Sequence, residues 1–362
     1  MTRAALIGTG LVGGSVGLAL RRTGITVRGY DRDAERLARA LDRGVLDEAT
    51  DSIEAAAADA DVVFVAVPVG ATADAVIAAL DAGAHVVTDV GSVKAPVVAA
   101  IEAARPELAA RYVGGHPMAG SEQDGLEGAD ADLVVGATWV LTPTDRTDAT
   151  AFAVVRALLG RLGAEVFAIS PSDHDALVAV VSHVPQLAAT TLMDVAAARG
   201  SSHALLLRLA AGGFRDMTRI AAGHPGIWPD ICVANRDAIV AALDEYVGAL
   251  SRVRALVEGG DREGLLEVLE RARTARRSLP SGVPADAALV ELRVPIPDRP
   301  GSLADVTTLA GTLGINIADI EIAHSVEGGG GVLVLLIEAS GAEAFAAALT
   351  ERGYHPASTV LP

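Results

Sequence analysis

Short apolar runs alternate with helix-forming stretches over the first 170 residues of the chain. Runs of this kind are typical of parallel strands that are buried on both faces. The alternation of strand and helix predicts an α/β fold with a doubly wound parallel sheet, whose strand carboxyl ends line a ligand crevice. The predicted strands are residues 4–7, 26–30, 62–68, 84–90, 111–113, 138–142 and 164–168.

The pattern changes after residue 171, where apolar residues begin to recur three and four positions apart in long alanine-rich segments. This spacing predicts an all-α region. Long helices with small side chains pack closely, often across a dimer interface, so we expect a homodimer. The predicted helices lie near residues 173–199, 202–222, 227–258 and 261–278.

A linker signal rich in proline and glycine at residues 279–284 precedes a third pattern. Strand-like and helix-like segments then follow one another in the order β-α-β-β-α-β, which is the ferredoxin-like α+β arrangement. We therefore expect three domains, at residues 1–170, 171–280 and 287–362. The segments are residues 288–294, 303–313, 316–322, 332–337, 342–352 and a short last strand.

Charge and composition narrow the possible partners. Lys and Arg number 29 against 46 Asp and Glu, a net charge of −17, which argues against nucleic acid or an anionic membrane as a partner. An anionic substrate must therefore meet a local cationic pocket. The single cysteine, Cys232, excludes an intramolecular disulfide and a thiolate metal cluster, and we expect no metal. His183, Pro185 and Gln186 interrupt the apolar runs and no cleavable signal is visible, so we expect a soluble, cytoplasmic protein without a membrane span.

A glycine motif, Gly8-Thr9-Gly10-Leu11-Val12-Gly13, stands between the first strand and a helix. In that context glycines allow a tight turn and close approach to a pyrophosphate at the helix N-terminus, as in Rossmann-type domains. Asp31 follows about twenty residues later, where an acid contacts the adenosine ribose and favours NAD over NADP. Arg32 could instead accept a 2′-phosphate, so NADP stays an alternative, as does an accidental glycine turn in a nucleotide-free domain.

Two further strand ends carry candidate cofactor contacts. Val67 and Pro68 end one strand, and Ser92 lies just beyond the carboxyl end of the next. From there Ser92 could reach the reactive end of the cofactor, although a serine at this position is also a common helix N-cap.

The segment Gly114-Gly115-His116-Pro117-Met118-Ala119-Gly120-Ser121-Glu122 sets one histidine between glycines, with a proline behind it. Glycines permit tight turns and close approach, and a histidine held this way suits proton transfer near neutral pH. A surface turn with an incidental histidine is the alternative. Because His116 follows a strand, we expect it at the same sheet edge as the glycine motif and Ser92. This is a dehydrogenase arrangement, in which nicotinamide takes a hydride and a nearby base takes the proton.

Three polar clusters interrupt the helical region. His183 and Gln186 lie in the first, where a histidine is often only a satisfied core group. The second begins at Gly212 and holds Arg219, which could clamp a carboxylate or simply pair with an acid on the surface. The third carries Trp228, one of two tryptophans, which could wall a pocket.

The combination of the glycine motif with Asp89-Val90-Gly91-Ser92-Val93-Lys94 and with the His116 segment resembles the prephenate/arogenate dehydrogenase family of tyrosine biosynthesis. The resemblance implies an NAD-dependent oxidative decarboxylation of prephenate to 4-hydroxyphenylpyruvate. It implies that His116 accepts the proton of the substrate hydroxyl and that Ser92 orients His116 or that hydroxyl. It also implies that Arg219 binds a substrate carboxylate.

The resemblance places further residues near the substrate, namely Glu122, His183, Gly212 and Trp228. Members selective for prephenate often have histidine where this chain has Gln186, and glutamine could serve either a keto-acid or an amino-acid side chain. Arogenate is therefore an alternative substrate. A nucleotide- and amino-acid-sensing regulator without turnover is an alternative of a different class.

Near the chain end, Asp298-Arg299-Pro300-Gly301-Ser302-Leu303 resembles the strand-to-helix loop of ACT domains, which bind amino acids there. The resemblance implies a regulatory module whose amino-acid effector contacts this loop and the nearby pair Asn316-Ile317. We expect tyrosine as the effector, with phenylalanine as the alternative. The alternative is a dimerisation module without a ligand.

Overall fold

The computed structural model describes residues 3–120, 123, 125–200, 206–278, 288–297, 299–324 and 330–360. The chain forms two compact units, one made of residues 1–193 and 220–248 and the other of residues 194–219 and 249–362. Each unit is described by itself below.

The first unit is built on an eight-stranded sheet with the order β3-β2-β1-β4-β5-β6-β7-β8. Its strands pair in parallel except for β6 and β7, which are antiparallel. The predicted wholly parallel sheet is therefore wrong at this pair, and the described residues between β6 and β7 form a short 3₁₀ turn and no crossover α-helix. The strands are β1 (Arg3–Ile7), β2 (Thr26–Tyr30), β3 (Glu48–Ala49), β4 (Val62–Val65), β5 (Val87–Asp89), β6 (Tyr112–Pro117), β7 (Thr138–Thr142) and β8 (Glu165–Ala168). The two-residue strand β3 was not predicted.

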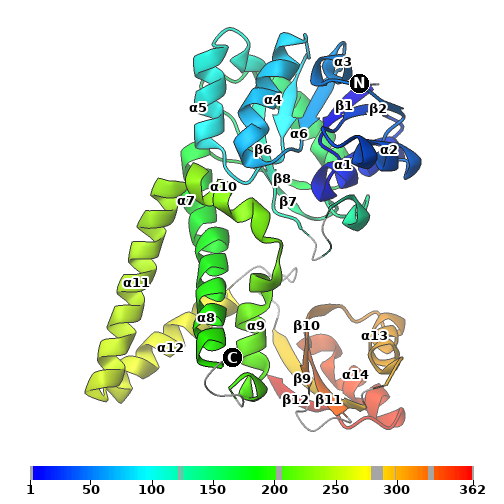
Figure 1. The fold of residues 1–362 in the computed structure, drawn as a ribbon. Coiled ribbons are helices and arrows are strands. Elements are labelled where there is room, and N and C mark those ends of the chain that lie inside the picture. The colour runs from blue at the N-terminus through cyan, green and yellow to red at the C-terminus, as the bar shows by residue number, and fades with distance from the viewer. Residues whose placement is uncertain are drawn as a thin grey trace. The chain divides into compact units, whose positions relative to one another are not determined.

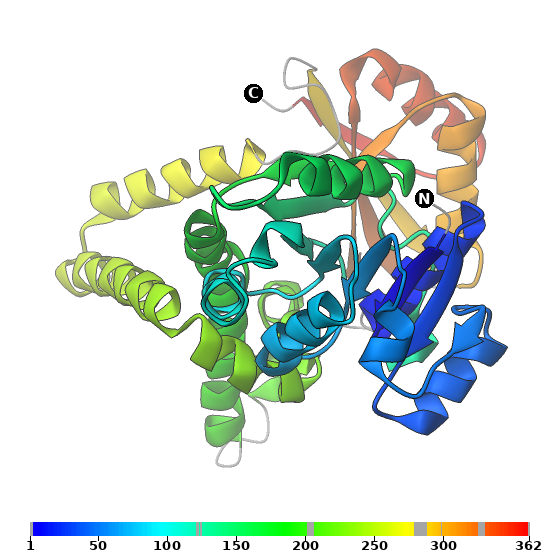
Figure 2. The same ribbon diagram turned by 90° about the horizontal axis from the view of Figure 1, so that it is seen from above.

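Helices cover both faces of this sheet (Figures 1 and 2). Leu6 and Phe64 point into a core shared with α1, α2 and α6, whereas the next residues along their strands, Ile7 and Val65, point into a core shared with α3, α4 and α5. Burial on both faces explains why the strands are continuous apolar runs. The helices are α1 (Leu11–Arg22), α2 (Ala34–Asp42), α3 (Ile53–Ala57), α4 (Val69–Asp81), α5 (Ala95–Ala104) and α6 (Ala149–Arg161), with 3₁₀ turns η1 (Ala109–Arg111) and η2 (Gly125–Gly128).

A helical run from residue 171 to residue 200 follows the sheet. Ser170 caps it by accepting a hydrogen bond from the backbone N–H of Asp173 at 3.1 Å, and Pro171 occupies the first position. The run consists of α7 (Pro171–Val178), a π-helical segment η3 (Ala179–His183) and α8 (Val184–Gly200). The run confirms the helix predicted near residues 173–199. By length and composition alone this run could cross a membrane, a test that core helices of soluble proteins also pass.

The helix predicted at residues 261–278 is confirmed, but the two helices predicted before it are not continuous. The described residues 206–222 do not form one helix, and the predicted helix at 227–258 is divided at Asn235. Glycines at 212, 213 and 223 and the proline at 225 lower the helix propensity of these stretches. The elements are η4 (Leu207–Leu209), α9 (Gly212–Thr218), η5 (Arg219–Ala222), η6 (Pro225–Ile227), α10 (Trp228–Ala234), α11 (Arg236–Gly259) and α12 (Arg262–Arg277).

The C-terminal part of the second unit is an antiparallel sheet of four strands with the order β10-β11-β9-β12 (Figure 1). Alternate residues of β9, such as Leu292 and Val294, are buried against the two helices, which matches a sheet with one covered face. The element order is the predicted one: β9 (Leu289–Pro297), α13 (Ser302–Thr312), β10 (Ile317–His324), β11 (Gly330–Glu338), α14 (Ala339–Glu351) and β12 (Ala357–Val360).

Candidate active site

The glycine motif forms the turn between β1 and α1. Gly8 has a φ of +94°, and a Cβ atom there would overlap the carbonyl oxygen of Ala66 at the end of β4, so only glycine fits. Gly10 caps α1 without a side-chain hydrogen bond, and a Cβ atom at Gly10 would meet no atom within 4 Å. Open space therefore lies beside Gly10, the residue that precedes the first backbone amides of α1. These residues fit a dinucleotide phosphate at a helix N-terminus.

Asp31 lies just after β2, beside this turn, and is only 6% exposed. Its Oδ2 accepts hydrogen bonds from the N–H and the hydroxyl of Thr9, at 2.8 and 2.9 Å, and its Oδ1 accepts one from the N–H of Asp33 at 2.9 Å. Asp31 therefore fixes the glycine turn to β2. A ribose hydroxyl would have to use the remaining acceptor capacity of Oδ1. Arg32 is exposed.

His116 lies within strand β6, opposite Val140 of β7, rather than in a turn after the strand. The predicted tight turn at the preceding glycines is therefore wrong. A Cβ atom on Gly115 would lie 2.7 Å from the carbonyl oxygen of Asp89, so this glycine is needed for close packing of β5 and β6. The predicted location at the carboxyl end of the strand is correct, because His116 is the fifth of six residues in β6.

A chain of hydrogen bonds links His116 to a carboxylate through a second histidine. Nδ1 of His116 lies 2.9 Å from Nε2 of His174, and Nδ1 of His174 lies 2.8 Å from Oδ1 of Asp175. The two rings meet edge to face with centroids 5.1 Å apart. His174 is fully buried and Asp175 is 4% exposed. Nε2 of His116 has no hydrogen-bond partner among the residues that the structure describes.

The carboxylate of Asp175 is anchored on both oxygens. It accepts the backbone N–H of Lys94 at 2.8 Å and that of Ala95 at 2.7 Å, and so caps the N-terminus of α5 from another helix. A negative charge is stabilised at this place. The side-chain amide of Asn235 donates to the backbone carbonyl of Asp175 at 2.9 Å and lies 3.2 Å from Nδ1 of His183.

A buried ion pair lies beneath this chain. The ammonium group of Lys94 contacts the Asp89 carboxylate and donates to the carbonyl oxygen of Gly115 at 2.8 Å. Asp89 also accepts the Tyr112 hydroxyl at 2.8 Å and the Gly115 N–H at 3.0 Å. Burial lowers the pKa of Lys94, which the Asp89 charge partly offsets, and burial followed by the Asp89 charge raises the pKa of Tyr112. The ion pair therefore ties β5, β6 and the start of α5 together behind His116.

The surroundings favour a neutral His116. Burial, followed by the charges of His174, Lys94 and His183, lowers the pKa of His116 well below that of a free imidazole. Burial likewise lowers the pKa of His183 to about 4, against the opposing effect of Asp175. A neutral imidazole is the form that can accept a proton.

The remaining predicted residues of the first unit are Val67, Pro68, Ser92, Gln186 and Trp228. Ser92 is half-buried in the loop after β5, but the hydrogen bond of the His116 ring goes to His174 rather than to Ser92. Gln186 is 8% exposed in α8, and the ring of Trp228 lies edge to face with His183 at 6.2 Å between centroids. Val67 and Pro68 follow β4 at the glycine-turn edge.

Two predicted substrate residues, Gly212 and Arg219, belong to the second unit. Their contact with a substrate beside His116 stays a prediction. Glu122 lies outside the described residues. In the part of the chain that the structure describes, no three His, Cys, Asp or Glu side chains are grouped so as to hold a metal ion.

Known proteins match this chain over both its sheet and its helices. The sequence profile described as "Prephenate dehydrogenase, nucleotide-binding domain" matches residues 16–168, and "Prephenate dehydrogenase, dimerization domain" matches residues 170–271. The prephenate dehydrogenase of Bacillus subtilis is 35% identical over 343 residues, which cover 91% of this chain and 90% of that protein. The chain belongs to the prephenate dehydrogenase family.

Solved structures of the family agree. The prephenate dehydrogenase of A. aeolicus, crystallised with hydroxyphenyl propionate and NAD+, has a TM-score of 0.72 at 32% identity, covering 77% of this chain and 99% of that one. The arogenate dehydrogenase of Synechocystis has a TM-score of 0.67 at 29% identity, covering 77% of this chain and all of that one. As a family member with the nucleotide-binding domain, the protein is an oxidoreductase.

Sequence reasoning on the prephenate dehydrogenase motifs missed His174, Asp175 and Asn235. His174 and Asp175 lie in the polar first turn of a helix, a pattern that is typical of helix N-capping. Asn235 lies in a stretch that was predicted to be one continuous helix. In an ordinary helix of 3.6 residues per turn, residues nine apart, such as His174 and His183, point to opposite sides. The π-helical segment between them changes this phase, and π segments often mark functional sites.

Proposed function

We propose that the protein is an NAD-dependent prephenate dehydrogenase. His116 carries this proposal. It lies at the carboxyl end of β6, with Nδ1 engaged by His174 and Nε2 without a partner among the described residues. A neutral imidazole with one free ring nitrogen at the edge that bears the glycine turn is suited to accept a proton from a substrate hydroxyl.

The reaction needs one base and one hydride acceptor. Bound NAD would supply the acceptor for the hydride that leaves the ring carbon bearing the hydroxyl group. His116 takes the hydroxyl proton, and the ring carboxylate leaves as carbon dioxide while its bonding electrons complete the aromatic ring. The proton on His116 can then return to the phenol oxygen of 4-hydroxyphenylpyruvate, so charges and atoms balance without an additional acid. Ser92 would orient His116 or the hydroxyl group.

The open glycine turn supports a dinucleotide, and the A. aeolicus relative was crystallised with NAD+. Gly8, Gly10 and the N-terminus of α1 would hold the pyrophosphate, Asp31 and Arg32 would face the adenosine ribose, and Val67, Pro68 and Ser92 would face the nicotinamide end. Asp31 as a carboxylate disfavours a 2′-phosphate, which supports NAD over NADP.

Arg219 would bind a carboxylate of the substrate, because a guanidinium group pairs with a carboxylate through two parallel hydrogen bonds. Gly212, Glu122, His183 and Trp228 would line the substrate site. Arogenate is the second candidate substrate. Gln186 is compatible with arogenate as well as prephenate, because a side-chain amide can face either an ammonium or a keto group. An arogenate dehydrogenase is also among the solved structures that resemble this chain.

A spectroscopic assay of NADH formation tests the proposal. The purified protein is mixed with NAD and either prephenate or arogenate, and kcat/KM is determined for each. We expect steady NADH formation with prephenate at a higher kcat/KM than with arogenate. A reversed ratio would assign arogenate as the substrate, and no NADH with either would leave only a sensor without turnover.

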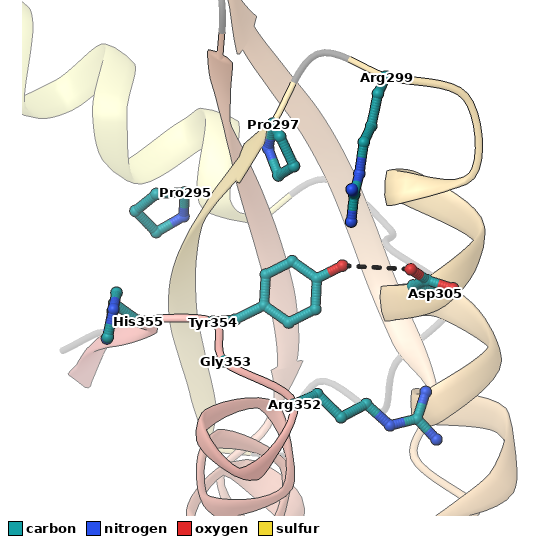
Figure 3. Close-up of a pocket in the computed structure, with 8 residues that line it drawn as sticks. All are labelled: Pro295, Pro297, Arg299, Asp305, Arg352, Gly353, Tyr354 and His355. Atoms are coloured by element: carbon teal, nitrogen blue, oxygen red, sulfur yellow. Dashed lines mark hydrogen bonds between the residues drawn. The ribbon is translucent and has the colours of Figure 1, made fainter.

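We propose further that residues 287–362 are an ACT domain that binds tyrosine as a feedback effector. A cavity of about 440 Å³ at the end of β9 supports this, and Figure 3 shows the Tyr354 hydroxyl directed at Asp305, 3.5 Å away, with Arg299 pointing toward the same pair. An arginine and a carboxylate in one cavity suit the carboxylate and the ammonium group of an amino acid. The cavity is lined by Pro295, Pro297, Arg299, Asp305, Arg352, Gly353, Tyr354 and His355.

Of the effector contacts expected from the sequence, only Arg299 is among the residues that line this cavity. Pro300, Gly301, Ser302 and Leu303 continue from it into the first turn of α13, and Gly301 has a φ of +94° there. Asn316 and Ile317 lie at the start of β10, and Asp298 lies outside the described residues. Their contact with the effector is part of the proposal.

A cytoplasmic homodimer is the proposed assembly. The dimerization-domain profile covers residues 170–271, and helices of that range expose apolar side chains. Leu177, Val180 and Val181 are 56%, 55% and 65% exposed on one stretch of the α7–η3 run. Apolar patches of this kind mark interaction surfaces, and a second copy of the chain would cover this one.

A further inference from the structure

The hydrogen bonds behind His116 determine which ring nitrogen carries its proton. An ionised carboxylate only accepts hydrogen bonds, and Asp175 lies at the N-terminus of α5, where two backbone amides hold it. Nδ1 of His174, 2.8 Å away, must therefore carry a hydrogen. In a neutral His174 the other nitrogen, Nε2, is then an acceptor.

The same logic continues to His116. Because Nε2 of His174 accepts, Nδ1 of His116 must donate across the 2.9 Å contact. The lone pair of His116 is then on Nε2, the ring nitrogen without a partner among the described residues. Burial of His174 and Asp175 keeps water from competing for these hydrogen bonds.

We propose that His174 is a positioning residue for the reaction. Together with Asp175 it holds His116 in the tautomer whose Nε2 can accept the substrate proton. Once His116 is protonated, its Nδ1–H remains bonded to His174, so the imidazolium cation stays paired toward Asp175. We call the hydrogen bonds from His116 through His174 to Asp175 the relay. It resembles a serine-protease triad, in which a carboxylate fixes the tautomer of the base. Here a second imidazole lies between the carboxylate and the base.

The charged and titratable groups around His116 come from several elements. His174, Asp175 and His183 belong to the helical run that begins at α7, whereas Asp89 and Lys94 flank the loop between β5 and α5. Lys94 is paired with Asp89 and does not contact the His116 ring nitrogens among the hydrogen bonds described. The tautomer of His116 is therefore set by His174 rather than by these other groups.

Two substitutions of His174 separate this role from a structural one. His174→Leu removes the acceptor, and His174→Gln restores one through its side-chain carbonyl. We expect kcat of His174→Leu to fall about a hundredfold with NAD affinity unchanged, and His174→Gln to stay within about tenfold of the wild type. The exposed His85, which precedes β5, provides the control His85→Leu, with unchanged kcat. Equal losses in the Leu and Gln variants would overturn the proposal.

A second readout does not depend on turnover. In protein labelled with ¹⁵N-histidine, ring nitrogen and proton shifts report the tautomer of each of the eight histidines. We expect His116 to be protonated at Nδ1 in the wild type and in His174→Gln, and to lose this preference in His174→Leu. His116 protonated at Nε2 in the wild type would overturn the proposal. The kinetic experiment rests on the proposed function, so absence of NADH formation by the wild type would contradict that function. The tautomer measurement would still test the hydrogen bonds between His116, His174 and Asp175.

Discussion

Two polar regions of this molecule differ in how completely their groups are paired. Around His116, both oxygens of Asp175 and the ammonium group of Lys94 have partners inside the protein. In the C-terminal cavity, the side chains of Arg299 and Arg352 make no hydrogen bond or ion pair among the described residues. Asp305 and Tyr354 there share one hydrogen bond at 3.5 Å, which is long.

The difference matches the tasks that we propose for the two regions. A base must be held in one tautomer and one orientation, which requires partners that are present before the substrate arrives. A reversible effector site gains its affinity from charges that find their partners only when the ligand binds. Changes near His116 should therefore affect folding and catalysis, whereas changes in the C-terminal cavity should affect regulation alone.

The largest effect on stability is expected from Lys94→Met. It would leave the buried Asp89 carboxylate without its cation, and breaking a buried pair in this way costs about 3–5 kcal/mol of unfolding free energy. Urea denaturation measures the loss. The matched control is Arg105→Met, which removes an exposed partner of Asp81 and should cost far less. Equal losses for the two variants would remove the contrast between the paired interior and the surface.

A smaller effect is expected from the double variant Arg299→Ala, Arg352→Ala. The tyrosine concentration that gives half-maximal inhibition should rise at least about tenfold, because hydrogen bonds to charged groups contribute about 1.5–3 kcal/mol each. Basal kcat and the melting temperature should not change. Arg293→Ala is the control, since Arg293 lies on β9 outside the cavity and pairs with Glu291 at 2.7 Å. Inhibition that is unaltered in the double variant, or equally weakened in the control, would contradict the proposed effector site.

A further effect concerns the pH dependence of stability. The folded protein holds His183 with a pKa of about 4, against 6.5 for an unperturbed histidine. Between these values the unfolded chain binds more protons, so this contribution to stability is present above pH 6.5 and is lost as the pH falls toward 4. Melting temperatures from pH 8 to pH 4 should show a flatter dependence in His183→Leu than in the wild type or in His85→Leu. Identical curves in all three proteins would refute this contribution.

Local signals allowed much of the fold to be predicted from the sequence. Continuous apolar runs predicted the strands of the first unit other than β3, and period-two alternation predicted β9. The direction of β7 relative to β6 could not be read this way, because apolar runs indicate burial and not strand direction. The glycines before His116 were assigned to a turn, because a glycine needed for close strand packing looks the same in sequence as one needed for a positive φ.

The candidate site was predicted less completely than the fold. The motifs pointed to His116 and Ser92, but the hydrogen-bond partner of His116 is His174, which is 58 residues away in the chain. Such a contact depends on how α7 packs beside β6 and α5, and it leaves no periodic pattern in the sequence. The π-helical segment after α7 changes which side chains share a face, and it too carries no obvious sequence signal.

The most direct test of the central claim is the kcat of His116→Asn with prephenate and NAD. Asparagine retains a polar side chain but has no ring nitrogen to accept a proton, and a general base of this type contributes about 10²–10⁴-fold. We predict that kcat falls by that factor while the Kd for NAD, measured by calorimetry, stays within about twofold of the wild type, because the glycine turn is untouched. Unchanged turnover in His116→Asn would contradict the account.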